Sequence, residues 1–236
     1  MTGTKRVAIV TGIGKPGQAG EMIARVLAEH DARIVAIGHS RSDTDARVAE
    51  LRTAGHDALG FACDLADESQ VAKLVGDVTA AVGARVDALV NVAGGFAMSG
   101  PVAESTSTVF HTQIAINLTT AYFATRGFLP LLRAGHGAIV YFSSAAVLPG
   151  ASAARMWAYG AAKSGVIAIM RAVAEEERAN GVRANAIAPT AIRTAANLAS
   201  MGENARYVER EDVAAAVLWL CSDAARAVTG QVIRLA

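Results

Sequence analysis

Short apolar runs that show no alternation with polar residues recur along the whole chain, and they constrain its fold more than any other feature. Lys5 to Thr11 is the first of these runs, and Arg33 to Ile37 and Ala58 to Cys63 follow. Such a run indicates a strand that is buried on both faces of a sheet. The remaining candidate strands are Asp87 to Asn91, Ala138 to Phe142, Arg183 to Ala188 and Gln231 to Leu235, which makes about seven in all.

Helical patterns separate these runs. Asp67 and Gln70 have the spacing of a helix cap, and Val71, Leu74 and Val78 follow as one apolar stripe. Other helices are expected from about Ser107 to Arg133, around Tyr159, and from Glu211 to Cys221. Because strands alternate with helices over the whole length, we expect an α/β fold with a parallel sheet covered on both faces. Residues 1–236 show no linker or internal repeat, which predicts one doubly wound domain.

Composition narrows the class of protein. Hydrophobic residues make up 53% of the 236 residues, far more than a disordered chain carries. The formal net charge of +1 gives no electrostatic case for a nucleic-acid or membrane partner. Cys63 and Cys221 are the only cysteines and indicate neither a disulfide framework nor a zinc site, so no metal is expected. Val7 to Val10 is too short for a signal-peptide core, so we expect a soluble, cytoplasmic protein.

A glycine-rich turn follows the first candidate strand and opens a helix. Gly12, Gly14 and Gly17 spell G-x-G-x-x-G, and Gly20 follows. In this context the glycines let the backbone approach a pyrophosphate, and the helix N-terminus supplies N–H groups and partial positive charge. The alternative is a merely flexible surface turn. The strand–turn–helix context favours a dinucleotide site and a Rossmann-like fold.

The end of the second candidate strand bears on which dinucleotide is bound. A carboxylate there would accept hydrogen bonds from the ribose 2′-hydroxyl and repel a 2′-phosphate. The chain has no acidic residue at this point before Asp43, and Ser40, Arg41, Lys15 or His39 could instead hold a phosphate. This predicts NADP(H) in preference to NAD(H), although each of these side chains could equally be a solvated surface residue.

The segment from Gly137 to Lys163 carries the candidate chemistry. Its strand ends at Ser143 and Ser144, and the helix that follows contains Tyr159 and Lys163. Residues four apart lie on one helix face, so the ammonium is expected beside the phenol and should lower the phenol's pKa. That arrangement suits proton transfer. The alternative is a half-buried ring with a lysine stem along it.

Together these motifs resemble the short-chain dehydrogenase/reductase family over essentially the whole chain. The residues that carry the resemblance are Thr11-Gly12 with the following glycines, Asp64, Asn91-Val-Ala-Gly94, Asn117, Ser144, Tyr159-Gly-Ala-Ala-Lys163, Asn185-Ala-Ile-Ala-Pro189 running to Thr194, and Thr229-Gly-Gln231. Several independent motifs in the right order make this resemblance specific.

The resemblance implies a role for each of these side chains. Tyr159 would protonate a carbonyl oxygen, Ser144 would orient that oxygen, and Asn117 would position water in a proton relay. Lys163 would hold the nicotinamide ribose and lower the tyrosine pKa. The implied cofactor-binding set is Gly12, Gly14, Lys15, Gly17, Ala19, Ser40, Arg41, Asp64, Leu65, Asn91, Ala93, Gly94, Tyr159, Lys163, Pro189, Ile192 and Thr194. Thr194 could instead be only a helix cap.

The chain departs from the family pattern in its cofactor motifs. The glycine turn is about two residues longer than usual, which leaves open the roles of Gly14, Gly17 and Gly20. Val92 replaces a common asparagine. Thr190 follows the proline where glycine is usual and restricts the backbone there. None of these changes removes a catalytic group.

Three loops, residues 95–105, 145–158 and 190–210, are expected to surround the substrate. The loop between Ser144 and Tyr159 is about two residues longer than usual, and the stretch from Thr194 to Arg210 is short, which suggests an open site. Candidate wall residues, which could equally be core or interface, are Gly95, Phe96, Met98, Val147, Leu148, Met156 and Trp157.

Two subfamilies compete as the nearest resemblance. The overall pattern is similar to 3-oxoacyl-[acyl-carrier-protein] reductases, whereas residues 93–98 and 194–201 resemble a group related to dihydropteridine reductases. The expected substrate is therefore only a carbonyl compound or an alcohol. A catalytically idle NADP(H)-binding sensor or scaffold is the alternative from another class. Members of the family are commonly joined through two long helices, which implies a homodimer or homotetramer.

Overall fold

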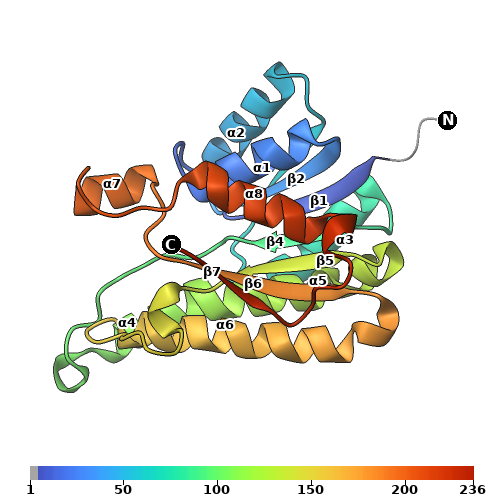
Figure 1. The fold of residues 1–236 in the computed structure, drawn as a ribbon. Helices are drawn as coiled ribbons and strands as arrows, with labels where there is room; N and C mark the ends of the chain where they lie inside the picture. The colour runs from blue at the N-terminus through green and yellow to red at the C-terminus, as the bar shows by residue number, and fades with distance from the viewer. Residues whose placement is uncertain (1–4) are drawn as a thin grey trace.

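The computed structural model describes residues 5–236 and shows seven parallel strands in one sheet (Figure 1). The strands are β1 (Arg6–Thr11), β2 (Ala32–Gly38), β3 (Ala58–Ala62), β4 (Ala88–Asn91), β5 (Ala138–Phe142), β6 (Arg183–Pro189) and β7 (Val232–Leu235). Their order in the sheet is β3-β2-β1-β4-β5-β6-β7, and every neighbouring pair is parallel. This confirms the doubly wound α/β fold.

Eight α-helices surround the sheet. They are α1 (Ala19–Glu29), α2 (Arg41–Thr53), α3 (Glu68–Val82), α4 (Ser107–Ile114), α5 (Thr120–Gly135), α6 (Trp157–Glu176), α7 (Ala195–Met201) and α8 (Arg210–Cys221). Side chains of α1, α2 and α8 pack on one sheet face, whereas those of α3, α5 and α6 pack on the other (Figure 1). Burial of both faces explains why the strands lack polar alternation.

Helix α2 has 13 residues, and the Ser40 side chain caps its N-terminus. One helix differs from the sequence prediction. The single helix expected from Ser107 to Arg133 is divided into α4 and α5 by a π-helical turn, Ala115–Thr119. Hydrophobic periodicity predicts that a helix is present. It does not detect a single extra residue inserted into the helix's hydrogen-bond ladder, which is what forms a π-helical turn.

The strand order reverses between β1 and β4. From β1 the chain moves outward through β2 and β3, then returns to β4 and continues in the other direction. In open parallel sheets, ligands bind in the crevice outside the carboxyl ends of the strands at such a switch point. Helices α4 and α7 lie beyond that edge of the sheet in Figure 1.

Within residues 5–236, no helix has the length and hydropathy that crossing a lipid bilayer requires. The cytoplasmic location expected from the sequence stays a prediction.

Candidate active site

The glycine turn lies directly against the turn that follows β4. Gly12 has a φ of +74°, and a Cβ built on it would come within 2.8 Å of the Ala93 backbone nitrogen. A Cβ on Gly20, in the first turn of α1, would lie 2.7 Å from the Gly12 carbonyl oxygen. Gly20 is therefore the residue that lets α1 pack on the turn. Gly14 meets nothing within 4 Å. The structure thus separates glycine roles that the motif left open.

Two cavities open along this crevice, and Gly12 and Gly94 line both of them. The larger has a volume of about 530 Å³ and lies between the glycine turn, the end of β2 and the end of β3. The smaller, of about 280 Å³, reaches Tyr159 and Lys163. A two-part crevice walled by glycine backbone fits an elongated dinucleotide, with one cavity for each half.

Thr11 fixes the two turns that form the shared wall. Its hydroxyl donates to the Val90 carbonyl at 3.3 Å and accepts from the Ala93 N–H at 3.0 Å. Thr11 is buried at the end of β1. It was predicted only as part of the family motif, and its contacts show that it holds the end of β1 to the β4 turn.

The larger cavity gathers several of the predicted cofactor-binding residues. Gly14, Lys15, Ser40, Asp64 and Leu65 all line it. Residues that line it without having been predicted as site residues include Ile13, Asp43, Ile116 and Thr120.

Arg41, which was predicted to bind the cofactor, does not line the larger cavity. Its side chain is 69% exposed and pairs with Asp45 at 2.8 Å, one turn further along α2. The prediction that Arg41 faces the cofactor does not agree with this structure, because α2 begins at Arg41 and offers it an i,i+4 carboxylate. Among the described residues that line the larger cavity, Lys15 is the only lysine or arginine. Asp43 lines this cavity too.

The smaller cavity brings together the residues predicted to carry the chemistry. Tyr159, Lys163 and Asn117 line it with Phe142 and Ser143. The Lys163 Nζ lies 5.6 Å from the centre of the Tyr159 ring and donates to the Phe142 carbonyl at 2.9 Å. Lys163 is only 6% exposed. Its ammonium is therefore fixed between the end of β5 and the tyrosine.

The pKa shifts at this pair differ from the prediction. Burial raises the pKa of Tyr159 above 10.0, and a hydrogen bond with Ser144 offsets part of that rise. Burial also lowers the pKa of Lys163 to about 8. The expected lowering of the tyrosine pKa by the ammonium is therefore wrong for this geometry, because the cost of burying a charge dominates.

The two serines after β5 have different tasks. The Ser143 hydroxyl donates to the Lys163 carbonyl at 3.0 Å, so it is engaged with the backbone of α6. The Ser144 hydroxyl accepts from the Ala146 N–H at 3.2 Å and also hydrogen-bonds Tyr159. Ser144 is thus the serine that acts on the tyrosine, although Ser143 is the one that lines the cavity.

Asn117 sits in the π-helical turn, and its side chain is buried. Its amide nitrogen donates to the Gly95 carbonyl at 2.9 Å and the Gln113 carbonyl at 3.1 Å, and its amide oxygen accepts from the Gly95 N–H at 3.1 Å. A Cβ on Gly94 would lie 2.6 Å from that same oxygen. The π-helical turn thus clamps the loop after β4 beside Lys163.

The remaining predicted residues divide into two groups. Ala19, Ala93, Gly94, Pro189, Ile192 and Thr194 line one or the other cavity. Thr194 is at the same time the N-cap of α7, with its hydroxyl accepting from the Asn197 N–H at 3.2 Å. Asn91 and Gly17 line neither cavity. The Asn91 amide donates to the Thr125 hydroxyl, and the Gly17 carbonyl accepts from the Ala195 N–H. Both residues therefore hydrogen-bond neighbouring elements and do not line a cavity.

Sequence reasoning missed Gln18, Thr190 and Asn197, which line the smaller cavity. A signal for Gln18 was available: it stands two residues before Gly20, where the family pattern has a glycine. Asn197 was marked only by its place in the expected substrate loop, residues 190–210, and the fold of α7 brings it to the cavity.

Phe96 lines the smaller cavity beside Tyr159. Phe96 is 57% exposed and meets the Tyr159 ring edge-on, with 5.2 Å between ring centres.

Two of the predicted substrate loops are joined by hydrogen bonds. The Arg155 carbonyl in residues 145–158 accepts from the N–H groups of Ser99 and Gly100 in residues 95–105. Arg193 is not free to face a substrate, since it pairs with Glu209 and Glu203.

The fold is of the Rossmann type, and its two-part crevice lies where proteins of this class bind a dinucleotide. A family model described as enoyl-(acyl carrier protein) reductase matches residues 12–235. The chain belongs to the short-chain dehydrogenase/reductase family.

Known proteins resemble the chain over nearly its whole length. The cis-4-hydroxycyclohexanecarboxylate dehydrogenase of Sinomonas cyclohexanicum is 35% identical, covering 97% of this chain and 94% of its own. A short-chain type dehydrogenase/reductase from Mycobacterium ulcerans superposes with a TM-score of 0.88 at 31% identity, covering 98% and 88%. An actinorhodin polyketide ketoreductase variant, solved with NADPH, gives a TM-score of 0.86 at 28% identity, covering 98% and 95%.

Proposed function

We propose that this protein is an NADP(H)-dependent oxidoreductase that transfers a hydride between the nicotinamide and a carbonyl compound or secondary alcohol. The observation that carries this proposal is the shared cavity of Tyr159, Lys163 and Asn117, which adjoins a second cavity through Gly12 and Gly94. The test is NADPH oxidation against a panel of ketones and aldehydes. Reduction of at least one of them supports the proposal. Tight cofactor binding without turnover on the whole panel would favour the sensor or scaffold alternative.

When bound, the nicotinamide supplies or accepts the hydride. Tyr159 serves as the general acid for the substrate oxygen, and its raised pKa keeps it protonated at neutral pH, which favours the reductive direction. Ser144 hydrogen-bonds the tyrosine and stabilises the phenolate left after proton donation. Lys163, held by the Phe142 carbonyl, places a positive charge beside that phenolate and offers its remaining protons to the cofactor ribose.

Cofactor preference should depend on Lys15 and not on Arg41. We expect Lys15→Ala to lower kcat/KM with NADPH by roughly 10- to 100-fold, the value of one charged hydrogen bond, and to leave NADH use almost unchanged. Arg41→Ala is the matched control, because its side chain pairs with Asp45 outside the cavity. Equal or better use of NADH by the unmodified protein would refute the preference. An Arg41→Ala loss as large as that of Lys15→Ala would refute the assignment to Lys15.

The pH dependence of reduction should follow Lys163. Below its pKa of about 8 the side chain carries its charge, and above that pH it loses it. Tyr159, with its pKa raised, remains a proton donor throughout this range. We therefore expect kcat/KM for carbonyl reduction to fall as pH rises through about 8. Lys163→Arg, which stays charged, should remove this alkaline limb from whatever activity it retains. A wild-type profile that is level up to pH about 10 would contradict the prediction.

We propose an apolar, bulky carbonyl substrate, because exposed apolar side chains lie in the loop that reaches the smaller cavity. Phe96 and Met98, both more than half exposed, lie in the loop after β4. One relative is by name a dehydrogenase of a cyclohexane carboxylate and another structure is a polyketide ketoreductase, so ring ketones belong first in the panel. 3-Oxoacyl thioesters and dihydropteridines, the substrates of the two competing subfamilies, complete it.

We further propose that the protein is a homodimer or homotetramer in solution. The exposed aromatic residues Phe110 and Tyr122 on α4 and α5, together with Trp219 on α8, would then be covered by another copy. Light scattering at micromolar concentration should give a mass of two or four chains. A clean monomer would overturn this proposal without affecting the chemistry.

A further inference from the structure

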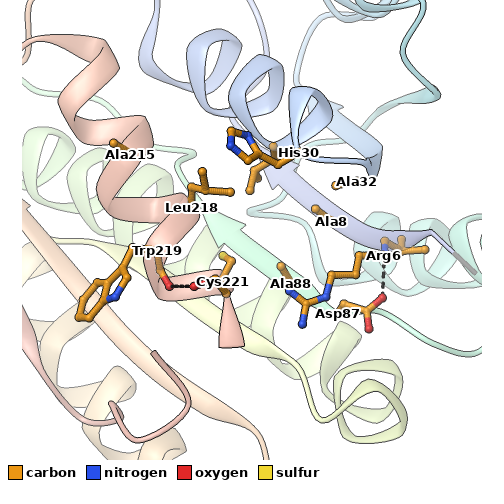
Figure 2. A pocket seen from close by; sticks show the side chains of 13 residues that line it. Arg6, Ala8, His30, Ala32, Asp87, Ala88, Ala215, Leu218, Trp219 and Cys221 are labelled. Carbon is orange, nitrogen blue, oxygen red and sulfur yellow. Dashed lines mark hydrogen bonds between the residues drawn. The ribbon is translucent and has the colours of Figure 1, made fainter. Parts of the chain in front are cut away.

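A polar cavity of about 460 Å³ lies at the edge of the sheet remote from Tyr159. The first residues of three strands line it: Arg6 of β1, Ala138 of β5 and Arg183 of β6. Because all strands are parallel, their amino ends face away from the cofactor crevice. An apolar cleft between α1 and α8 adjoins this cavity and shares Arg6, Asp87 and Cys221 with it (Figure 2).

The cavity concentrates positive charge. Five arginines and His136 line it together with two aspartates: Arg6, Arg85, Arg178, Arg183, Arg226, Asp87 and Asp223. With His136 neutral, five arginines against two aspartates give a formal charge of +3, whereas the whole chain carries +1. Glu175, which pairs with Arg178 from outside the lining, brings this excess to +2.

Three of the arginines already have carboxylate partners. Arg6 pairs with Asp223 at 2.5 Å, Arg85 pairs with Asp87 at 2.7 Å, and Arg178 pairs with Glu175 at 2.8 Å. Asp87 also accepts from the Val7 N–H at 2.9 Å. Both aspartates of the cavity are thus committed to other partners.

Arg183 and Arg226 have no carboxylate partner among residues 5–236. The guanidinium of Arg183 meets the Val228 carbonyl at 3.4 Å and the Ser222 carbonyl at 3.3 Å, both long contacts. Arg226 reaches only the Asp223 carbonyl, at 3.5 Å. Burial lowers the pKa of Arg183, and the negative charge of nearby Asp223 offsets only part of that lowering. Two guanidinium forks in one cavity therefore lack an anion.

We propose that this cavity binds a small phosphate-type oxyanion, with Arg183 and Arg226 as its charged ligands. Phosphate presents several oxygens and up to two negative charges, which matches two forked donors in a way that a single carboxylate does not. The cavity volume admits inorganic phosphate or a small phosphate ester. The site is separate from the cofactor crevice, so it does not depend on the proposed function.

The test is isothermal titration of the protein with inorganic phosphate while the dinucleotide is saturating, so that phosphate sites in the cofactor crevice are filled. Ionic strength is held constant with chloride. We expect saturable binding of one phosphate per chain. Arg226→Gln, an exposed substitution, should weaken it at least tenfold, and Arg226→Lys should restore part of it. The Tm of Arg226→Gln should stay within a few degrees of that of the wild type, which shows that the variant is folded.

Arg171→Gln is the matched control, because Arg171 is an exposed arginine on α6 that lines none of the cavities described. It should bind phosphate like the wild type. Arg183→Gln should also weaken binding, but it touches two backbone carbonyls, so its thermal stability is measured beside it. Non-saturable binding, or an equal loss in Arg171→Gln and Arg226→Gln, would overturn the proposal.

Discussion

Tyr159→Phe should lower kcat for carbonyl reduction by about 10²- to 10⁴-fold, the usual worth of one general acid. The substitution removes only the hydroxyl that donates the proton. The ring keeps its edge-on contact with Phe96 and its place beside the Lys163 ammonium. Cofactor affinity should therefore change little. Steady-state rates and a fluorescence titration with NADPH measure the two quantities separately.

Tyr122→Phe is the control for this experiment, since Tyr122 is 43% exposed on α5 and lines neither cavity. It should leave both rate and affinity as they are. If Tyr159→Phe kept normal turnover, Tyr159 would not be the acid and the proposed mechanism would fail. A parallel loss of NADPH affinity would mean that the hydroxyl serves cofactor binding instead of proton transfer.

Gly12→Ala should reduce the free energy of unfolding by about 2–5 kcal/mol, because two penalties add. A side chain at positive φ costs about 1–2 kcal/mol, and forcing a methyl into a filled space costs about 1–3 kcal/mol more. The clash is with the Ala93 backbone, which cannot rotate away. For a chain of this size we expect the Tm to fall by about 5–15 °C. The shared wall of the two cavities should be displaced, and NADPH affinity should fall as well.

Gly14→Ala provides the comparison within the same turn. Gly14 is not among the glycines with positive φ, and a Cβ there meets nothing within 4 Å. Its Tm should stay within a few degrees of the wild type. Equal destabilisation by the two substitutions would show that the turn tolerates no side chain anywhere, and the separate role assigned to Gly12 would be wrong. Calorimetry of both variants decides between these outcomes.

The sequence was informative wherever local spacing determines geometry. Tyr159 and Lys163, four apart, share a helix face in any α-helix that contains them, and the structure places both in one cavity. The apolar runs without alternation predicted buried parallel strands, and all seven were found within about two residues of their expected ends.

Prediction was weakest where the environment of a side chain is decided by the folded arrangement. Arg41 follows the second strand as a phosphate ligand should, yet it pairs with Asp45 one turn later and does not line the cavity. The Tyr159 pKa was expected to fall because the sequence shows a neighbouring lysine. It rises because surrounding elements bury the ring, which no local pattern records.

By itself, then, the sequence determined the order of strands and helices, the family, and the residue types that carry the chemistry, because these follow from hydrophobic periodicity and short-range spacing. Only the tertiary structure decided which glycine touches the β4 turn, that a π-helical turn clamps Gly95 through Asn117, and that unpaired arginines gather at the amino ends of the strands. Those features join residues far apart in the chain, and contacts, burial and charge compensation are set by the folded arrangement.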